Sequence, residues 1–312
     1  MKIVAPVQLV AVALAALMAQ QSFAGRGLQN GQLAGLPKFL IGIYQPDNAV
    51  QPRPGLNASH AFFPLAAADS PFRLRAYLLR SSTARTLPMV SLEPFPASDR
   101  PQGGHQLLQD MQAGVYDDRI DAIVTELRQS KRPILLRFAH EMDAQGLYPW
   151  SYVDGRKYVA LYRYVHRRAL ALGASNILWV WSPQGRKNAD QFWPGRRQVD
   201  LIGVSLYASK LFSADRELAS FQSLLNQRLW LSKRFGKPII ATEVGVSGDD
   251  REQKLWIGKA LSSLNQYPEL RGFFYYQAQQ PDFMPIASGH EDWRLPPAAL
   301  SKLSKRALEL HP

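Results

Sequence analysis

The apolar residues of this chain gather in eight short runs that are separated by longer, more polar stretches. Within each run the apolar residues are nearly contiguous rather than alternating, which is typical of parallel strands buried on both faces. The eight predicted strands cover residues 39–44, 60–65, 88–92, 133–138, 177–181, 201–205, 238–242 and 272–276.

The stretches between these strands have the periodicity of amphipathic helices. Apolar residues recur at i, i+3, i+4 and i+7 in 120–127, and 158–172 and 257–264 follow much the same pattern. Ser70 followed by Pro71 predicts a helix with Ser70 as its N-cap and proline at its first position. Two glycines stand where helices are predicted to end before a strand: Gly173 and Gly236.

Eight strands alternating with helices predict an α/β fold, a single-domain (β/α)8 TIM barrel. A doubly wound open sheet is the alternative that the pattern alone leaves open. The barrel makes the sharper prediction, because its active groups should come from several strands and lie together at their C-terminal ends.

Polar and aromatic residues follow the predicted strands at that end. His140 and Glu141 come directly after the fourth strand, and Glu243 comes after the seventh. Because these strands lie nearly opposite each other across an eight-stranded mouth, the two carboxyl groups can converge on one bond. The other strand ends carry Glu93 after the third strand, Trp181 at the end of the fifth, Tyr207 after the sixth and Tyr276 at the end of the eighth.

Two facing carboxyl groups suit the hydrolysis of a glycosidic bond. One must be protonated to donate to the leaving oxygen, and the other ionised to attack the anomeric carbon. Aromatic rings suit sugars as well, because the apolar C–H faces of a sugar stack on them, although each ring taken alone could equally be a core residue. The aromatic candidates are Trp150, Trp181, Trp193, Tyr207 and Trp293.

Other catalytic motifs are incomplete in this sequence. The stretch HEMDA at 140–144 begins like the HExxH zinc helix, but alanine stands where the second histidine is needed. The stretch GVSLY at 203–207 begins like a nucleophile elbow and lacks the closing glycine. No phosphate-binding glycine loop of the Walker type is present. We therefore expect neither a cofactor nor a metal.

The first residues are typical of a signal peptide, with Lys2, an apolar run over 4–18 and small residues before Ala24. Cleavage after Ala24 predicts a secreted or periplasmic catalytic domain of residues 25–312, with a retained N-terminal anchor as the alternative. No later segment is typical of a membrane span. The chain has no cysteine, so the exported protein must rest on its hydrophobic core rather than on disulfides.

The chain carries 37 basic and 25 acidic residues, a formal net charge of +12. This balance fits either an anionic partner or a soluble basic surface, and nucleic acid is not expected without a matching fold motif. Arg186, Lys187, Arg196 and Arg197 follow the fifth strand. We expect them on the active-site face, where they could receive an anionic polysaccharide.

Five blocks follow one another along the chain, and LEPF stands after the third strand. The blocks are DDRIDAIVTELRQSKRPILLRFAHEMDAQGLYPW, WVWSP, FWPGRRQVDLIGVSLY, KPIIATEVG and EDWRL. In these blocks and in their order the sequence resembles glycoside hydrolase family 26, within the clan A retaining β-glycanases. The resemblance extends from about Gly42 to Leu295.

The resemblance implies a role for each matching residue. Glu141 would be the general acid/base and Glu243 the nucleophile, with Tyr207 steadying the carboxylate of Glu243. His140 would hydrogen-bond to the sugar where cleavage occurs. From the strand interior, Arg137 would either support the carboxylates or form a purely structural ion pair. The remaining substrate-binding candidates are Glu93, Trp150, Trp181 and Trp293.

The sequence departs from the family beside the acid/base, where Asp143, Ala144 and Leu147 replace the usual residues. This leaves the glycan open among β-1,4-mannan, xylan, mixed-linkage glucan and an exopolysaccharide. The resemblance implies a mannanase-like endo-β-glycanase that cleaves by double displacement. A compact single barrel makes a monomer the default expectation. The alternative is a carbohydrate-binding barrel with weak or no catalysis that serves exopolysaccharide assembly or export.

Overall fold

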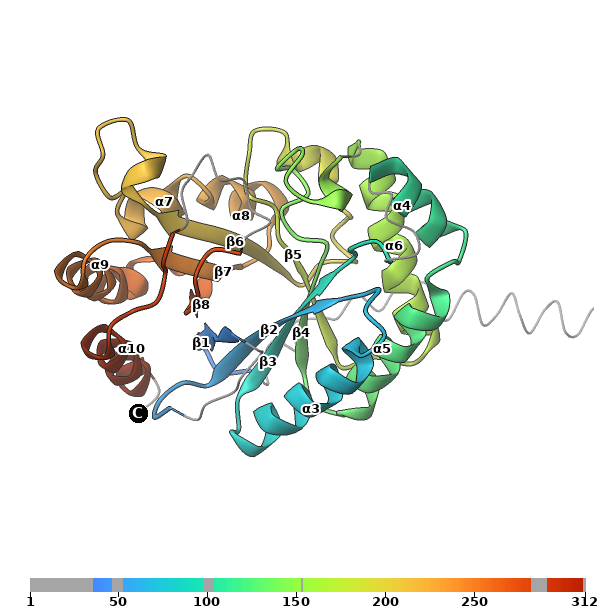
Figure 1. The fold of residues 1–312 in the computed structure, drawn as a ribbon, viewed down its shortest axis with the longest axis horizontal. Coiled ribbons are helices and arrows are strands. Elements are labelled where there is room, and N and C mark those ends of the chain that lie inside the picture. Colours follow the sequence, from blue (N-terminus) through green and yellow to red (C-terminus); the bar gives the residue numbers. More distant parts are fainter. Residues whose placement is uncertain (1–35, 47–52, 98–103, 153, 282–290, 311–312) are drawn as a thin grey trace, which may run out of the picture. The chain divides into compact units, whose positions relative to one another are not determined.

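The structure, a computed structural model, describes residues 36–46, 53–97, 104–152, 154–281 and 291–310. Its strands pair in parallel in chain order, and β1 also pairs with β8, so the sheet closes into a barrel (Figure 1). The predicted (β/α)8 barrel is confirmed, and the open sheet is excluded. The strands are β1 Leu40–Tyr44, β2 Ala58–Pro64, β3 Leu87–Glu93, β4 Ile134–Phe138, β5 Ile177–Trp181, β6 Leu201–Ala208, β7 Ile239–Val246 and β8 Leu270–Tyr276.

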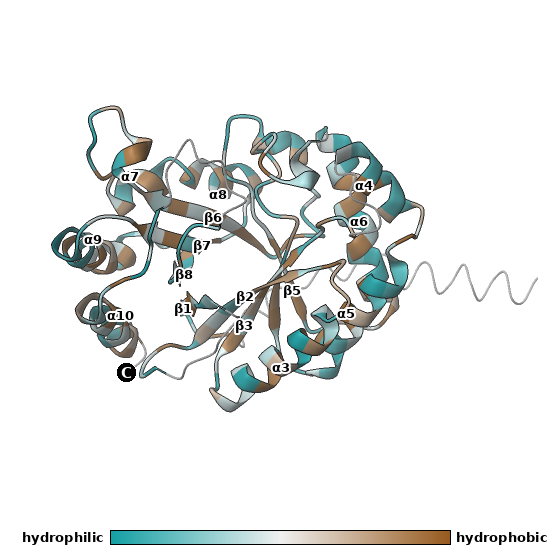
Figure 2. Ribbon diagram, viewed as in Figure 1, coloured by the Kyte–Doolittle hydropathy of each residue, from teal (hydrophilic) through white to brown (hydrophobic). Residues whose placement is uncertain are grey.

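Helices surround the strands (Figure 1). In Figure 2 the strands are largely apolar, whereas the helices carry both apolar and polar residues, as expected for elements with one face on a core. Within the described ranges, no helix is both long and apolar enough to cross a membrane. The α-helices are α3 Ser70–Thr83, α4 Gly104–Gln112, α5 Asp117–Gln129, α6 Gly155–Ala171, α7 Phe221–Asn226, α8 Leu229–Phe235, α9 Asp250–Ser263 and α10 Pro297–Leu310. The short 3-10 helices are η2 Pro149–Ser151, η3 Ala189–Phe192, η4 Lys210–Phe212 and η5 Leu264–Gln266.

The predicted element boundaries need two corrections. Strands β6 and β7 continue past their predicted ends, so Tyr207 and Glu243 lie inside strands rather than after them. Residues of β6 and β7 remain paired through these positions, and the side chains of Tyr207 and Glu243 point into the barrel interior. The N-cap of α3 is Asp69 rather than Ser70, whose hydroxyl donates instead to the carbonyl of Pro64 at 2.6 Å. Gly236 ends α8 in the left-handed region, as expected.

The barrel interior is apolar deep inside and polar towards the C-terminal ends of the strands. Deep inside, the ring of Phe274 fills the space beside Gly42, where an added Cβ would lie 2.4 Å from the ring. Nearer the mouth, His60, Ser91 and Arg137 project inward and are almost completely buried. The hydrogen bonds within this layer satisfy it only in part, because Nδ1 of His60 and Nε of Arg137 have no partner among the described residues. The layer lies directly under the mouth.

A β-bulge sets the orientation of Glu243. Along β6 and β7, Val204 pairs with Ala241, but the next residue, Ser205, pairs with Glu243. Thr242 is therefore an extra residue on β7. Bulges beside active sites commonly re-aim a side chain, and this one places Glu243 next to Ser205 on the inner face of the barrel.

Candidate active site

A cavity of about 790 Å³ opens at the C-terminal ends of the strands. Three carboxyl groups line it, and they come from the end of β3, the loop after β4 and the middle of β7. The sequence therefore brought Glu93, Glu141 and Glu243 to one place, together with Tyr207 and Trp293. The other lining residues include Tyr44, Phe62, Leu147, Tyr148, Gln184, Arg186, Leu211, Phe212, Leu224, Arg228 and Tyr276.

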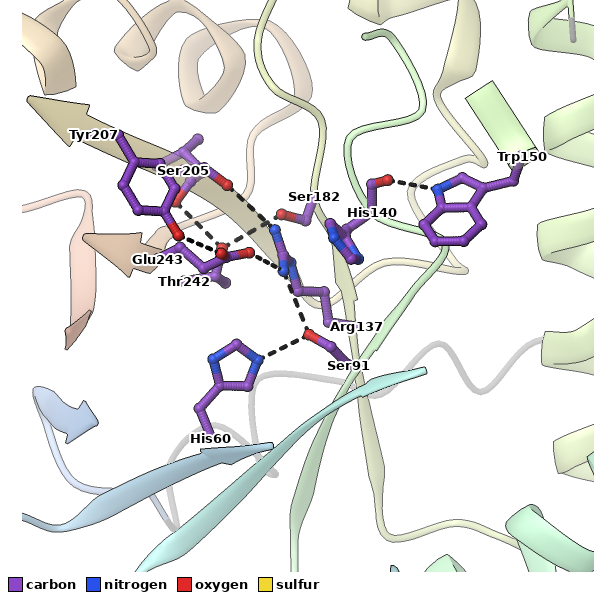
Figure 3. Close-up of polar contacts among 11 residues, drawn as sticks. His60, Ser91, Arg137, His140, Trp150, Ser182, Ser205, Tyr207, Thr242 and Glu243 are labelled. Atoms are coloured by element: carbon purple, nitrogen blue, oxygen red, sulfur yellow. Dashed lines mark hydrogen bonds and ion pairs between the residues drawn. The ribbon is translucent and has the colours of Figure 1, made fainter. Parts of the chain in front are cut away.

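Glu243 is held by two donors on its two carboxylate oxygens. The hydroxyl of Tyr207 donates to Oε2 at 2.5 Å, and Nη1 of Arg137 donates to Oε1 in a buried ion pair (Figure 3). Arg137 has no exposed surface, and it also donates to the hydroxyls of Ser91 and Ser205 at 3.4 and 3.3 Å. Charge-assisted bonds of this kind favour the ionised carboxylate.

The support for Glu243 continues into the barrel through His60. Nε2 of His60 lies 2.8 Å from the hydroxyl of Ser91, which in turn contacts Arg137 (Figure 3). Burial, and to a lesser extent the charge of Arg137, holds the pKa of His60 well below its usual value, so its ring is neutral. Sequence reasoning treated His60 only as a strand residue. A histidine in an otherwise apolar strand was the only sequence signal that could have indicated its role in the site.

The backbone around Glu141 is strained. Ala139 and Glu141 have φ values of 47° and 53°, in the left-handed region that few non-glycine residues adopt. The amide of Glu141 donates to the carbonyl of Ser182 at 2.7 Å, which fastens this turn to the end of β5. Strain of this kind persists where the surroundings over-determine a conformation, and such places are commonly functional.

The three carboxyl groups are electrostatically different. Burial, followed by the charge of Glu243, raises the pKa of Glu141 to about 7, although Arg137 and Ser205 partly oppose the shift. Burial and the charge of Glu243 likewise raise the pKa of Glu93 to about 8. Near neutral pH the cavity therefore presents one ion-paired carboxylate, one carboxyl group that is about half protonated (Glu141) and one that is mostly protonated (Glu93).

The tryptophans divide into one that lines the cavity and two that do not. Trp293 lines it beside Tyr207, with ring centroids 4.7 Å apart. Trp150 and Trp181 have no exposed surface, which does not fit the sugar contact predicted for them. The indole N–H of Trp150 donates to the carbonyl of His140 at 2.6 Å, and Trp181 packs against Trp193. Both rings therefore pack behind the cavity lining instead of forming part of it.

His140 is also buried, with 1% of its surface exposed, and it is not among the lining residues. Tyr148 lines the cavity in its neighbourhood, stacking on Trp150 at 4.6 Å and meeting the edge of His140. The sequence predicted the right aromatic cluster but not the member that lines the cavity. Tyr148 stands two residues before Trp150, and spacing alone does not show which ring faces outward.

Asp143, one of the departures from the family pattern, is a buried structural anchor. Its carboxylate accepts the backbone N–H groups of Gln184, Gly185 and Arg186 at 2.6, 2.9 and 2.8 Å. It has 1% of its surface exposed. Asp143 thus ties the loop after β4 to the loop after β5, and its side chain is turned away from the cavity lining.

The predicted basic face of the site is only partly present. Arg186 lines the cavity, but Arg196 donates to the carbonyl of Phe235 at 3.3 Å, just before β7 begins. Because the strands are parallel, the start of β7 lies at the opposite end of the barrel. The prediction for Arg196 was wrong, since the long segment between β5 and β6 returns to that end before β6. Arg228 lines the cavity instead and was missed.

The fold and this geometry define a class: a closed (β/α)8 barrel whose cavity is lined by one carboxyl group from the loop after β4 and one from within β7. No cluster of three or more His, Cys, Asp or Glu side chains that could hold a metal occurs among the described residues. Residues 108–228 match the family described as Glycosyl hydrolase family 26, which confirms the resemblance inferred from the sequence. The match includes Glu141 and Tyr207 and ends before Glu243.

Known proteins show the same likeness. The chain is 28% identical over 142 residues to a β-1,3-xylanase, TXYA, of a Vibrio species, covering 44% of this chain and 28% of the relative. It is 27% identical over 193 residues to a β-1,3-xylanase of an Alcaligenes species, covering 55% and 40%. The chain thus aligns with less than half the length of either relative.

Among solved structures, a modular endo-β-1,4-mannanase from Cellulomonas fimi superimposes with a TM-score of 0.63. Its sequence is 18% identical, and the superposition covers 92% of this chain and 74% of the mannanase. At this identity the likeness establishes the fold alone.

Proposed function

We propose that the protein is a retaining endo-β-glycanase. The observation that carries the proposal is the division of charge in one cavity, where Glu243 is ion-paired with Arg137 and the pKa of Glu141 is raised to about 7. A retaining glycosidase needs this combination of an ionised nucleophile and a protonated acid. The family match and the names of the similar proteins support the same class of reaction.

In this mechanism, Glu243 attacks the anomeric carbon while Glu141 donates its proton to the leaving oxygen. A covalent glycosyl ester forms on Glu243, which removes its negative charge. Because that charge is the second largest cause of the raised pKa of Glu141, the pKa should then fall. Glu141 is thereby prepared to act as the base that activates water for the second displacement.

Two further side chains are assigned to substrate binding. Glu93, kept neutral by its raised pKa, would donate a hydrogen bond to a sugar hydroxyl rather than compete with Glu243 for positive charge. Trp293 would offer its ring to a sugar face beside Tyr207. His140, Trp150 and Trp181 would act indirectly, by holding these walls in place.

The substrate is proposed as a β-linked polysaccharide. Two similar proteins are named β-1,3-xylanases and another an endo-β-1,4-mannanase, so linkage and sugar both need measurement. The screen should compare β-1,4-mannan, β-1,4-xylan, β-1,3-xylan, mixed-linkage glucan and acidic exopolysaccharides. Product size over time distinguishes endo from exo cleavage.

The decisive test replaces the nucleophile. Glu243→Ala should reduce turnover by roughly 10⁴-fold, a size typical of losing a covalent catalyst. Added azide should restore part of the activity and give a product of inverted configuration. Glu217→Ala, at an exposed position away from the cavity, is the matched control and should leave turnover unchanged. Full activity in Glu243→Ala would refute the mechanism, and glycan binding without turnover in the unaltered protein would favour the carbohydrate-binding alternative.

Export and a monomeric state belong to the same proposal. The signal segment lies outside the described residues, and so does most of the sequence before β1. N-terminal sequencing of the exported protein should begin at Gly25 if cleavage follows Ala24. Light scattering of the purified chain should give the mass of one copy.

A further inference from the structure

Two arginines line the cavity on the side formed by the loops after β5 and β6. Arg186 belongs to the loop after β5, and Arg228 stands immediately before α8. They are far apart in sequence but contribute to the same cavity as the three carboxyl groups. Their charge therefore faces the space that a substrate would occupy.

Arg228 is partly buried without a matching carboxylate. Its Nε is buried and has no hydrogen-bond partner among the described residues, and Nη1 contacts only Gln227 at 3.4 Å. By contrast, Arg168 on the outer surface pairs with both Asp117 and Asp121. In the described part of the chain, neither cavity arginine forms an ion pair. An unpaired guanidinium in a partly dry site is costly unless a ligand satisfies it.

The loop after β5 is shaped around Arg228. A Cβ added at Gly185 would lie 2.3 Å from Cδ of Arg228, so the absence of a side chain leaves room for this arginine. Gly185 has a φ of 89°, and its amide is held by Asp143. The same anchor holds the amide of Arg186. Asp143 and Gly185 thus position both arginines.

The arginines are placed near Glu141, because Asp143, two residues after Glu141, accepts the amide N–H of Arg186. Burial lowers the pKa of Arg228, and the nearby charges of Asp143 and Glu141 partly oppose that shift. In the proposed mechanism Glu141 protonates the leaving oxygen. The sugars next to these arginines are therefore those of the leaving group.

We propose that Arg186 and Arg228 bind an anionic substituent, a carboxylate or a sulfate ester, on the leaving-group side of the glycan. The substrate would then be an acidic β-glycan, such as one containing uronic acid. The guanidinium fork matches an oxyanion with two parallel hydrogen bonds, and such bonds are strongest when partly shielded from water. This inference rests on the proposed function for its orientation, but the binding itself can be measured without turnover.

The experiment uses Glu141→Gln, which resembles the protonated acid and keeps the pair between Glu243 and Arg137. Calorimetry compares a glucuronic-acid-containing β-oligosaccharide with the same oligosaccharide after carboxyl reduction. We expect the acidic form to bind about tenfold or more tightly, as for hydrogen bonds to a charged group. The preference should weaken as salt is raised. A sulfated oligosaccharide and its desulfated form distinguish the two kinds of oxyanion.

Adding Arg186→Gln and Arg228→Gln to that background should remove the preference and leave binding of the reduced oligosaccharide nearly unchanged. The matched control is Arg196→Gln with Arg197→Gln, which removes the same charge and keeps the preference. Because replacing the half-buried Arg228 can disturb folding, Arg186→Gln is also tested alone, at an exposed position. This single variant should lose part of the preference for the acidic oligosaccharide. Equal affinity for both forms of both glycans, with all variants folded, overturns the inference. If neutral glycans are still cleaved, the proposed function survives that outcome.

Discussion

Two walls of the cavity are built in different ways. One wall consists of strand residues, with Glu93, Tyr207, Glu243 and Tyr276 fixed by the ladders of β3, β6, β7 and β8. The other wall consists of loop and helix residues after β4, β5 and β6, from Gln145 to Arg228. In this wall Leu211 and Phe212 have 48% and 52% of their surfaces exposed.

The difference between the two walls separates the residues that carry out the reaction from those that determine substrate preference. A reaction needs groups held to within fractions of an ångström, which paired strands provide, whereas substrate preference can be changed by altering loops without disturbing the barrel. Glu141 stands at the junction. It follows β4 and is held by its strained backbone and by the hydrogen bond from its amide to the carbonyl of Ser182, rather than by strand pairing. Perturbing the strand wall should therefore reduce kcat, and perturbing the loop wall should mainly raise KM.

Apart from replacing Glu243 itself, the largest effect is expected from Arg137→Met, which removes the residue that supports the strand wall from inside the barrel. Glu243 would lose its charged partner inside the barrel, and we expect kcat to fall roughly 10²–10³-fold, as when one preorganised donor is removed from an active site. Stability should also fall by about 3–5 kcal/mol, because breaking a buried pair leaves an uncompensated charge. Steady-state kinetics and thermal unfolding measure the two effects.

Arg137→Lys is the informative control for that change. It keeps the positive charge but lacks the planar fork that reaches Glu243 and the two serine hydroxyls together. We expect most of the loss in kcat to remain. Normal kcat in both variants would show that Arg137 is only a structural residue.

The next largest effect is the pH dependence of kcat/KM, which is set by Glu141. Because Glu141 must be protonated and its pKa is raised to about 7, kcat/KM should fall about tenfold per pH unit above that value. Measuring kcat/KM from pH 5 to 9 tests this. A glycoside whose leaving group needs no proton should be cleaved by Glu141→Gln without the alkaline fall. An unchanged fall in that variant would assign the titration to another group.

The sequence predicted the strand wall well because two periodic rules fix it. Apolar runs identified all eight strands, and β5 was predicted with its observed ends. Parallel strands then carry their polar residues to one mouth, so Glu93, Glu141 and Glu243 could be grouped without coordinates. Even there, the extra residue Thr242 lay beyond prediction, because a bulge depends on the pairing partner rather than on the local sequence.

The loop wall was predicted poorly because its geometry depends on contacts distant in sequence. In the sequence Asp143 is only a departure from the family pattern beside the acid/base, yet its carboxylate accepts backbone N–H groups about forty residues away. Arg196 looked like part of the mouth, and the path of its loop carries it to the other end. Trp150 and Tyr148 are neighbours of the same type, and only packing decides that Tyr148 faces the cavity.

A smaller effect is expected when the loop wall is loosened through Asp143→Ala. Three backbone N–H groups lose their acceptor, which should destabilise the protein by about 1–3 kcal/mol. KM should rise several-fold because the segment carrying Arg186 is no longer fixed, while kcat changes less. Asp143→Asn keeps one carbonyl oxygen as an acceptor, so its stability and KM should lie between those of the unaltered protein and those of Asp143→Ala. A fall in kcat at constant KM would contradict the division between the walls.

The effect on catalysis is expected to be smallest for Glu93, whose contribution appears in stability rather than in rate. Its pKa is raised from 4.5 to about 8 in the folded protein, so the native state binds more protons than the unfolded state between these values. Stability should therefore be fully present below about pH 4.5 and decline as pH rises towards 8. Glu93→Gln removes this contribution, and its melting temperature should decline less between pH 5 and pH 9, by roughly 2–4 °C for each kcal/mol. Glu217→Gln, which removes an exposed carboxylate, should decline as the unaltered protein does. If Glu93→Gln declines equally steeply, Glu93 is ionised in the folded protein, and its assignment as a neutral hydrogen-bond donor to the sugar must be abandoned.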